Sequence, residues 1–121
     1  MVETVNPLSR RSYGQFCGLA RALDIVGDRW NLLIVRELLP GPLRYSELKA
    51  SLPGVASNLL AERLRTMEDT GVVERVLGDA GVLYGLTRWG AELQEPMEAL
   101  GRWGVPLLAA GQGDCLLYTS P

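Results

Sequence analysis

The residues best suited to chemistry lie on one face of a predicted helix, residues 57–70. Apolar residues at helical spacing predict its buried stripe: Leu60, Leu64 and Met67. Steps of about 100° per residue place the polar side chains on the opposite face, with Ala61 on its flank: Asn58, Glu62, Arg65 and Asp69. Asparagine can bond an adenine edge at two atoms, and arginine a guanine edge. Asn58 and Arg65 are therefore candidates for contacting base edges, although the same face could be an ordinary solvated surface.

Residues around this helix could contact phosphate groups, which position a protein on DNA without reading its sequence. The candidates are Arg44, Ser46, Lys49, Ser57 and Arg75. Each of them could equally be an ordinary surface residue. From Arg44 to Arg75 the chain has five basic residues (Arg44, Lys49, Arg63, Arg65, Arg75) and five acidic ones (Glu47, Glu62, Glu68, Asp69, Glu74). The segment is therefore no basic patch, and we expect modest affinity for nonspecific DNA.

Composition argues against catalysis and against bound metal. The chain has no histidine, which excludes Ser-His-Asp triads and His-based zinc sites. Its two cysteines, Cys17 and Cys115, have no metal-ligand spacing and cannot form a disulfide framework. The remaining carboxylates and tyrosines form no recognisable catalytic set. We therefore expect a protein that is not an enzyme and that needs no cofactor.

Length and hydropathy indicate one folded domain. The chain has 121 residues, of which 47% are hydrophobic and 21% charged, with a net charge of −2, which is close to average globular usage. No apolar run reaches the roughly 18 residues of a spanning helix, and the N-terminus lacks the apolar core of a secretory signal. The expected location is the cytoplasm, without membrane contact.

The elements that would position the candidate residues follow from periodicity and from turn signals. We expect a first helix from Cys17 to Val26 that stops at Gly27, and an apolar second helix from Arg29 to Leu39 capped by Asp28. After Pro40-Gly41-Pro42, a short helix from Glu47 to Leu52 should begin at Ser46 as its N-cap, and Ser57 should cap the helix 57–70. Arg63 of that helix points to the edge of the core, where we expect a structural ion pair.

Two short strands and a final helix complete the predicted pattern. Val72–Leu77 and Val82–Leu86 flank Gly78-Asp79-Ala80-Gly81, which can close a hairpin. This order predicts a mainly α fold with a small β-hairpin wing, a winged helix-turn-helix of the α+β type. From Thr87 onward a loose apolar stripe continues at helical spacing, and Pro96 should kink or divide it. The apolar face of this last helix is best explained by a partner subunit.

Both ends of the chain are expected to lie outside the domain, which would span residues 14–110. Residues 1–13 are polar without periodicity and are expected to form a flexible arm. Residues 111–121 are expected to be a disordered tail, and from Cys115 the sequence resembles a translated transposase adapter end used in sequencing libraries. On that interpretation the tail is an artefact and the natural protein is longer. A genuine disordered tail is the alternative.

Three stretches of the chain together resemble the HxlR family of bacterial regulators, relatives of the MarR family. They are CGLARALDIVGDRWNLLIVRELLPGPLRYSELKASLPGVASNLLAERLRTMEDTGVVERV, YGLTRWGAEL and ALGRWG, and the resemblance covers about residues 13–104. It implies a winged-helix fold, a homodimer built by the first and last helices, and transcriptional control of a neighbouring gene. Gly18 stands where the family often has proline, and the wing loop is short, which puts wing contacts in doubt.

The resemblance gives a specific expectation for DNA binding. Helix 57–70 would lie in the major groove and the wing, residues 72–86, on the backbone. Two recognition helices one turn apart predict a pseudo-palindromic operator in double-stranded DNA, with half-sites about 34–36 Å apart. A winged-helix module that binds proteins is one alternative. The N-terminal half of a larger ligand-sensing regulator is another, because similar long family members can carry an added C-terminal domain resembling a sterol-carrier fold.

Cys17 is the candidate redox sensor. It lies at the start of the first helix, where backbone amides and the helix dipole can stabilise a thiolate. Some members that resemble this chain sense quinones, aldehydes or oxidants through a cysteine here, so the resemblance implies an electrophile or another small molecule as a candidate inducer. The alternative is a small apolar residue packed in a dimer interface. Three tryptophans, Trp30, Trp89 and Trp103, are interpreted as packing residues rather than a ligand cage.

Overall fold

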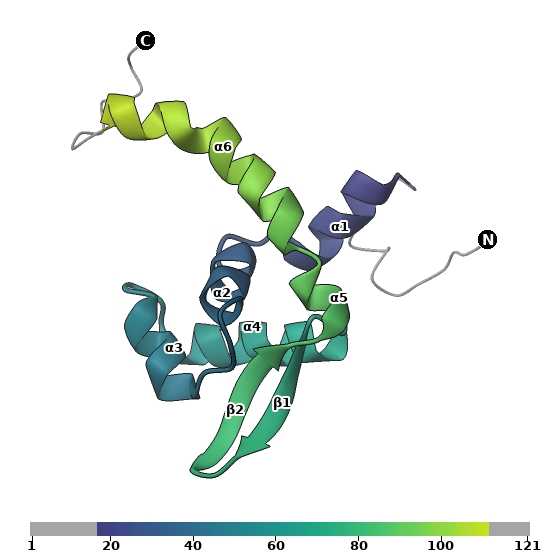
Figure 1. Cartoon of the computed structure of the whole chain (residues 1–121), viewed down its shortest axis with the longest axis vertical. Helices are drawn as coiled ribbons and strands as arrows, with labels where there is room; N and C mark the ends of the chain where they lie inside the picture. Colours follow the sequence, from purple (N-terminus) through teal and green to yellow (C-terminus); the bar gives the residue numbers. More distant parts are fainter. Residues whose placement is uncertain (1–16, 112–121) are drawn as a thin grey trace. The chain divides into compact units, whose positions relative to one another are not determined.

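The computed structural model describes residues 17–111, with side chains described up to residue 109. The expected arm at 1–13 and the expected tail beyond Gly111 lie outside the described residues. The chain divides between Ala91 and Glu92 into two compact units, and each is described by itself. Figure 1 shows the order of the elements along the chain.

Local capping contacts define where the first two helices begin and end. Helix α1 spans Gly18–Val26, with Cys17 as N-cap and Gly27 as C-cap, whose N–H donates to the Leu23 carbonyl at 2.9 Å. The predicted helix therefore ends where it was expected to end. Helix α2 spans Asn31–Leu38 and begins two residues later than predicted. Its N-cap is Trp30, whereas the Asp28 carboxylate accepts from the Trp30 N–H at 3.3 Å in the preceding turn.

Helices α3 and α4 form the helix-turn-helix, but their N-caps differ from the predicted ones. Helix α3 spans Tyr45–Ser51 and its N-cap is Arg44, so the prediction that Ser46 caps it is wrong. The start is stabilised instead by the Glu47 carboxylate, which accepts from the Arg44 N–H at 2.9 Å. Helix α4 spans Ser57–Asp69, and its N-cap is Ala56, without a side-chain bond. Ser57 is therefore the first helical residue, and the prediction that it caps α4 is also wrong.

The end of α4 is fixed by glycine. Gly71 has a φ of +87°, the left-handed conformation that favours glycine after a helix. Its N–H donates to the Glu68 carbonyl, and the Val72 N–H donates to the Met67 carbonyl at 2.9 Å. This pair of bonds is the Schellman motif, and the buried side chains of Met67 and Val72 supply its apolar contact. The chain thus leaves α4 directly into the first strand.

The wing is a two-stranded antiparallel hairpin. Strand β1 spans Val73–Gly78 and β2 spans Gly81–Leu86, paired from Val73 opposite Leu86 to Gly78 opposite Gly81. Two residues, Asp79 and Ala80, make the turn, and Gly81 has a φ of +124°. An isolated bridge between Leu43 and Tyr84 attaches β2 to the segment before α3. The wing is therefore anchored to the helix-turn-helix at its base.

The core of the first unit is apolar and lies between the helices and the base of the wing. Its fully buried side chains come from α2, α3, α4, the connecting turn and β1: Ile34, Val35, Leu38, Leu48, Leu52, Leu60, Leu64, Met67, Val72 and Val73. Short helix α5, Arg88–Ala91, closes the unit, and the Thr87 hydroxyl accepts from the Gly90 N–H at 2.9 Å. The mainly α fold with a β-hairpin wing, predicted from the sequence, is confirmed.

The second unit contains helix α6, Gln94–Gly111. The predicted division of the last helix is present, but α5 ends at Ala91 and α6 begins at Gln94, before Pro96. Pro96 stands in the first turn of α6, where a missing N–H costs no intrahelical bond. Pro106, which the sequence reasoning did not single out, lies inside the helix. Among residues 17–111, no helix is both long and apolar enough to cross a membrane.

Candidate nucleic-acid interface

The outer face of α4 is polar and accessible, as predicted. Leu60, Leu64 and Met67 are at most 1% exposed, which fixes the rotation of the helix about its axis. The predicted outward residues are all exposed: Asn58, Glu62, Arg65 and Asp69. Ala61 is half-buried, as expected of a flanking position. The helix therefore presents an amide and a guanidinium on the side away from the core, about two turns apart along the helix.

The angle between α3 and α4 is held by the turn between them. Gly54 has a φ of +93°, and Leu52 and Val55 on either side of it are buried. The Tyr45 hydroxyl of α3 donates to the Ser57 carbonyl in the first turn of α4 at 2.6 Å. Sequence reasoning missed Tyr45, because a single tyrosine beside Arg44 carries no periodic signal. This bond ties the start of the candidate recognition helix to the helix before it.

The phosphate candidates near α3 lie partly at its exposed N-terminal end. Arg44 and Ser46 are exposed, and Lys49 is half-buried on the same helix. Ser57 is exposed at the first position of α4. Exposed arginine, lysine and hydroxyl groups at helix starts are the groups that usually contact phosphate oxygens. The structure leaves these side chains accessible, and whether they contact DNA stays a prediction.

Arg75 of the wing is already paired with a carboxylate. Its Nε donates to Glu68 Oε2 of α4 at 2.8 Å. This hydrogen bond and the charge of Glu68 raise the pKa of Arg75 above its ordinary value. Sequence reasoning missed Glu68 as the partner, because the two residues lie seven positions apart in different elements. Arg75 is thus exposed, but its guanidinium is already paired with Glu68.

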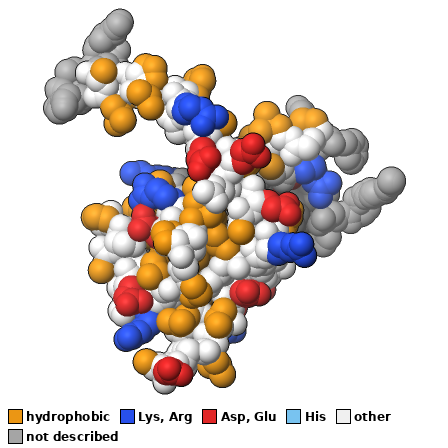
Figure 2. All heavy atoms as spheres, viewed as in Figure 1, with side chains coloured by type: hydrophobic (Ala, Val, Ile, Leu, Met, Phe, Trp, Pro, Cys, Tyr) orange, Lys and Arg blue, Asp and Glu red, His pale blue; other side chains and the backbone are white. Residues whose placement is uncertain are grey.

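Charges on the first unit are mixed rather than segregated. Figure 2 shows Lys and Arg side chains interspersed with Asp and Glu on the visible face, and hydrophobic side chains along α6. This agrees with the equal numbers of basic and acidic residues between Arg44 and Arg75. Long-range attraction of DNA by such a surface is weak, because attraction depends on a local excess of positive charge. Specific contacts must therefore supply a large share of any DNA affinity.

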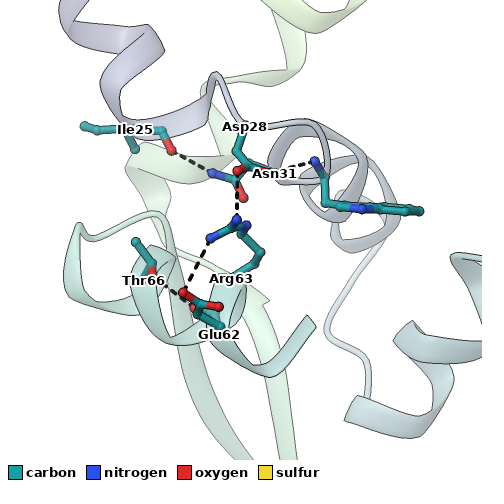
Figure 3. Close-up of polar contacts among 7 residues, drawn as sticks. Ile25, Asp28, Asn31, Glu62, Arg63 and Thr66 are labelled. Atoms are coloured by element: carbon teal, nitrogen blue, oxygen red, sulfur yellow. Dashed lines mark hydrogen bonds and ion pairs between the residues drawn. The ribbon is translucent and has the colours of Figure 1, made fainter. Parts of the chain in front are cut away.

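A polar cluster links α4 to the junction of α1 and α2 (Figure 3). Arg63 Nη2 lies 2.9 Å from Asp28 Oδ2, which confirms the predicted structural ion pair. Arg63 Nη1 lies 3.9 Å from Glu62 Oε2. Nearby, Asn31 Nδ2 donates to the Ile25 carbonyl at 2.8 Å, and Asn31 is only 4% exposed. The cluster therefore joins three helices through polar contacts.

Cys17 is the N-cap of α1 and is exposed. Its Sγ accepts from the Ala20 N–H at 3.3 Å. Cys115, the other cysteine of the sequence, lies outside the described residues. Between residues 17 and 111 no group of three or more Cys, Asp and Glu residues is arranged to hold a metal ion. The thiol of Cys17 is therefore open to reagents from solvent at one end of α1.

The fold and the exposed face of α4 together define a winged helix-turn-helix protein. Residues 25–111 match the family model described as HxlR-like helix-turn-helix. This match covers well over half of the chain. The chain therefore belongs to the HxlR family of helix-turn-helix proteins.

Proteins with sequences similar to this chain are named as transcriptional regulators. The chain is 35% identical over 97 residues to the HTH-type transcriptional regulator YodB of Bacillus subtilis, covering 78% of this chain and 87% of YodB. It is 36% identical over 112 residues to the uncharacterized HTH-type transcriptional regulator Rv3095 of Mycobacterium tuberculosis, covering 90% of this chain and 69% of Rv3095. The chain is thus a transcriptional regulator of the HxlR and MarR type. Such regulators are not enzymes, which agrees with the expectation from composition.

Solved structures of similar proteins have the same fold. Reduced YodB from Bacillus subtilis gives a TM-score of 0.68 at 32% identity, covering 80% of this chain and 99% of YodB. The quinone-bound form of YodB gives 0.66 at 34% identity, covering 72% of this chain and 94% of that chain. The redox regulator HypR in its reduced form gives 0.68 at 25% identity, covering 74% of this chain and 91% of HypR.

Proposed function

We propose that this protein binds a specific site in duplex DNA as a homodimer, with α4 in the major groove. The observation that carries the proposal is the rotation of α4. Its apolar stripe is fully buried, so Asn58 and Arg65 are presented outward from a rigid helix-turn-helix. A helix carrying amide and guanidinium groups at its surface matches the width and the hydrogen-bonding pattern of the major groove.

Exposed apolar side chains support the homodimer. On α1, Leu19 is 70% exposed, and on α6, Trp103 and Leu107, which lie one turn apart, are 76% and 59% exposed. Large apolar side chains at neighbouring helical positions are costly to leave in water, and such faces mark subunit interfaces. A two-fold dimer would present two α4 helices to successive turns of DNA and would bind a pseudo-palindrome.

The wing, residues 72–86, is proposed to lie along the backbone beside the groove. Its basic residue, Arg75, would have to exchange Glu68 for a phosphate oxygen. Arg44, Ser46, Lys49 and Ser57 would contact phosphates from the other side of α4. These contacts position the dimer, whereas discrimination among sequences is assigned to Asn58, Arg65 and their neighbours Ala61 and Glu62.

A shift assay on the DNA upstream of the gene tests this function. The apparent affinity is measured at several salt concentrations, and the protected region is then footprinted. We expect a two-fold symmetric footprint and a clear decrease of affinity with salt, because phosphate contacts release counterions. A salt slope near zero would favour the protein-interaction module, and a single asymmetric half-site would contradict the dimer.

We propose in addition that Cys17 makes DNA binding sensitive to electrophiles or oxidants. Its thiol is exposed, and it caps α1, a helix assigned to the dimer interface. A quinone-bound and a diamide-treated structure exist for the similar regulator YodB. Modification of a thiol at this cap would disturb the start of α1 and, through it, the dimer. A purely structural cysteine is the competing interpretation.

The Cys17 proposal is tested by treating the protein–DNA complex with a quinone or with diamide. We expect release of DNA by the unsubstituted protein and retention by Cys17→Ser, because serine also caps helices but is not a comparable nucleophile. Mass spectrometry locates the quinone adduct or, after diamide has oxidised two thiols, the disulfide that contains Cys17. Equal release from both proteins would reject the role of Cys17 and leave the DNA-binding proposal standing.

A further inference from the structure

We propose that Arg63 is a positioning residue of the DNA-binding surface: its ion pair with Asp28 fixes the recognition helix relative to α1. Arg63 belongs to α4 but is not on its outward face, because its side chain is only 24% exposed and is directed to the α1–α2 junction. It therefore acts through the position of Asn58 and Arg65 rather than by touching DNA. The inference rests on the proposed function.

Asp28 has two roles at this junction. One carboxylate oxygen, Oδ2, lies 2.9 Å from Arg63 Nη2, and the other, Oδ1, accepts from the Trp30 N–H at 3.3 Å. The same side chain therefore shapes the turn into α2 and binds α4. A displacement of that turn would be transmitted directly to the guanidinium of Arg63.

Asn31 extends the connection to α1. Its Nδ2 donates to the Ile25 carbonyl, in the last turn of α1, at 2.8 Å. Asn31 is buried in the first turn of α2 beside the loop that contains Asp28. The Asn31 N–H donates to the Asp28 carbonyl at 3.2 Å, so the chain of contacts runs from the α1 backbone through Asn31 and Asp28 to Arg63. We call these three residues the polar joint.

The polar joint fixes the orientation of α4 more sharply than the apolar core does. Contacts between apolar side chains are non-directional, so a helix can shift slightly on its stripe at modest cost. A short ion pair and a hydrogen bond are directional and weaken quickly when the atoms separate. Arg63 Nε is buried without a hydrogen-bond partner among the described residues. Its positive charge is compensated chiefly by Asp28 at 2.9 Å, the nearer of two carboxylates, since Glu62 lies 3.9 Å away.

The consequence for DNA binding is geometric. In the proposed dimer, α1 belongs to the subunit interface, and α4 enters the groove. The polar joint connects these two elements, so it contributes to the separation and relative orientation of the two α4 helices. A dimer with a fixed separation discriminates against operators with altered half-site spacing, and a dimer with a loose joint discriminates less.

The experiment measures spacing preference. Three probes are used: the footprinted upstream DNA, and two derivatives with one base pair inserted or deleted at the centre. Each change alters half-site separation by about 3.4 Å and rotates one half-site by about 34–36°. Affinities are measured for the unsubstituted full chain and for Asp28→Asn and Arg63→Met. Asparagine can still accept from the Trp30 N–H, and methionine keeps an apolar stem, so each removes chiefly the ion pair.

We expect the unsubstituted protein to prefer the natural spacing by about tenfold or more, a difference of roughly 1.4 kcal/mol. Both variants should lower this preference to about threefold or less, with a loss of affinity mainly on the natural spacing. Arg63→Lys, which keeps the charge, should recover part of the preference. Thermal unfolding of each variant gives the folded fraction, by which the affinities are corrected.

The matched control is Arg36→Met. Arg36 pairs with the adjacent Glu37 at 2.7 Å on the exposed side of α2, so this variant loses the same charge without altering the polar joint. Its spacing preference should be unchanged. If Asp28→Asn and Arg63→Met keep the natural spacing preference, or bind all three probes more weakly by one common factor, the inference is overturned. Failure of the unsubstituted protein to bind any probe would instead reject the proposed function.

Discussion

Asn58 and Arg65 occupy exposed positions two turns apart on a helix whose rotation is fixed by its buried stripe. Among residues 17–109, Arg65 forms no ion pair with a carboxylate. Its guanidinium can therefore bind a base edge without first giving up an internal partner. Arg63, two residues earlier, is held by Asp28, and Arg75 by Glu68. At the residue scale, Arg65 is thus available to contact DNA, whereas Arg63 and Arg75 are held by internal ion pairs.

Replacing either base-contact candidate should weaken specific binding. For Asn58→Ala and for Arg65→Ala we expect a loss of about 1–3 kcal/mol in affinity for the footprinted DNA, because a bidentate contact is removed. Arg65→Lys should recover little, since lysine cannot make the bidentate contact. Titration against a library of single base-pair changes locates the position at which discrimination is lost. Unchanged discrimination at every position would show that neither residue reads bases.

Removing the partner of Arg75 should strengthen nonspecific binding. In Glu68→Gln the wing arginine loses its ion pair and becomes available to phosphates, and one negative charge near DNA disappears. We expect a higher affinity for random duplex DNA and a salt slope steeper by about 1.8, which is about 0.9 for each of the two phosphate contacts that the dimer would gain. The double variant Glu68→Gln with Arg75→Gln is the control, and it should have no added slope. An unaltered slope in Glu68→Gln would mean that the wing does not approach the backbone.

At the scale of elements, periodicity predicted the helices and strands well, because burial of apolar side chains in the core largely determines their positions along the chain. The stripe of α4 agrees with expectation, and the ends of α1 and of the two wing strands agree with it to within one residue. Helix starts were harder to predict, since several capping residues compete within a few positions. Ser46 and Ser57 were predicted as caps, but at the start of α3 the Glu47 carboxylate accepts from the Arg44 N–H, and the start of α4 has no side-chain cap. Such contacts depend on the three-dimensional turn and have no periodic signature.

The uncapped start of α4 offers a stabilising substitution. Ala56 is the N-cap, with φ −73° and ψ 146°, and it makes no side-chain hydrogen bond. Serine fits this conformation and can accept from a free N–H in the first turn. Ala56→Ser should therefore raise the free energy of unfolding by about 1 kcal/mol, measured by urea denaturation. Ala56→Gly is the control and should gain less, and a destabilised Ala56→Ser would show that the position is constrained by something other than capping.

Helix α5 lies so close to the backbone of Val72, just before β1, that Gly90 cannot carry a side chain. A Cβ placed there would overlap the Val72 carbonyl oxygen. Because the obstacle is backbone, relief requires α5 to move away from the wing base. Gly90→Ala should lower the free energy of unfolding by about 1–3 kcal/mol. Gly41→Ala, where nothing lies within 4 Å of the added Cβ, is the control, and equal stabilities of the two variants would contradict this packing.

At the scale of the whole molecule, the sequence predicted an apolar last helix but could not fix what covers it. Amphipathic spacing along α6 is visible in the sequence, whereas a partner surface is formed by residues distant along the chain or in another copy. Leu100, Trp103, Leu107 and Leu108 are all more than half exposed. The dimer therefore remains a proposal that rests on this face and on the family's implied assembly. A charge placed on the face tests it directly.

Leu107→Glu should dissociate the proposed dimer, because a carboxylate would be buried in an apolar interface without a partner. Sedimentation velocity should show a dimer for the unsubstituted chain and a monomer for the variant. Ala109→Glu is the control: it adds the same charge at an exposed site about 200° further around α6. If specific binding requires two α4 helices, one from each subunit, Leu107→Glu should also lose affinity for DNA with two half-sites, whereas Ala109→Glu should keep it. If the unsubstituted chain is a monomer in solution but gives a two-fold symmetric footprint, the dimer assembles only on DNA. Leu107→Glu should then give an asymmetric footprint.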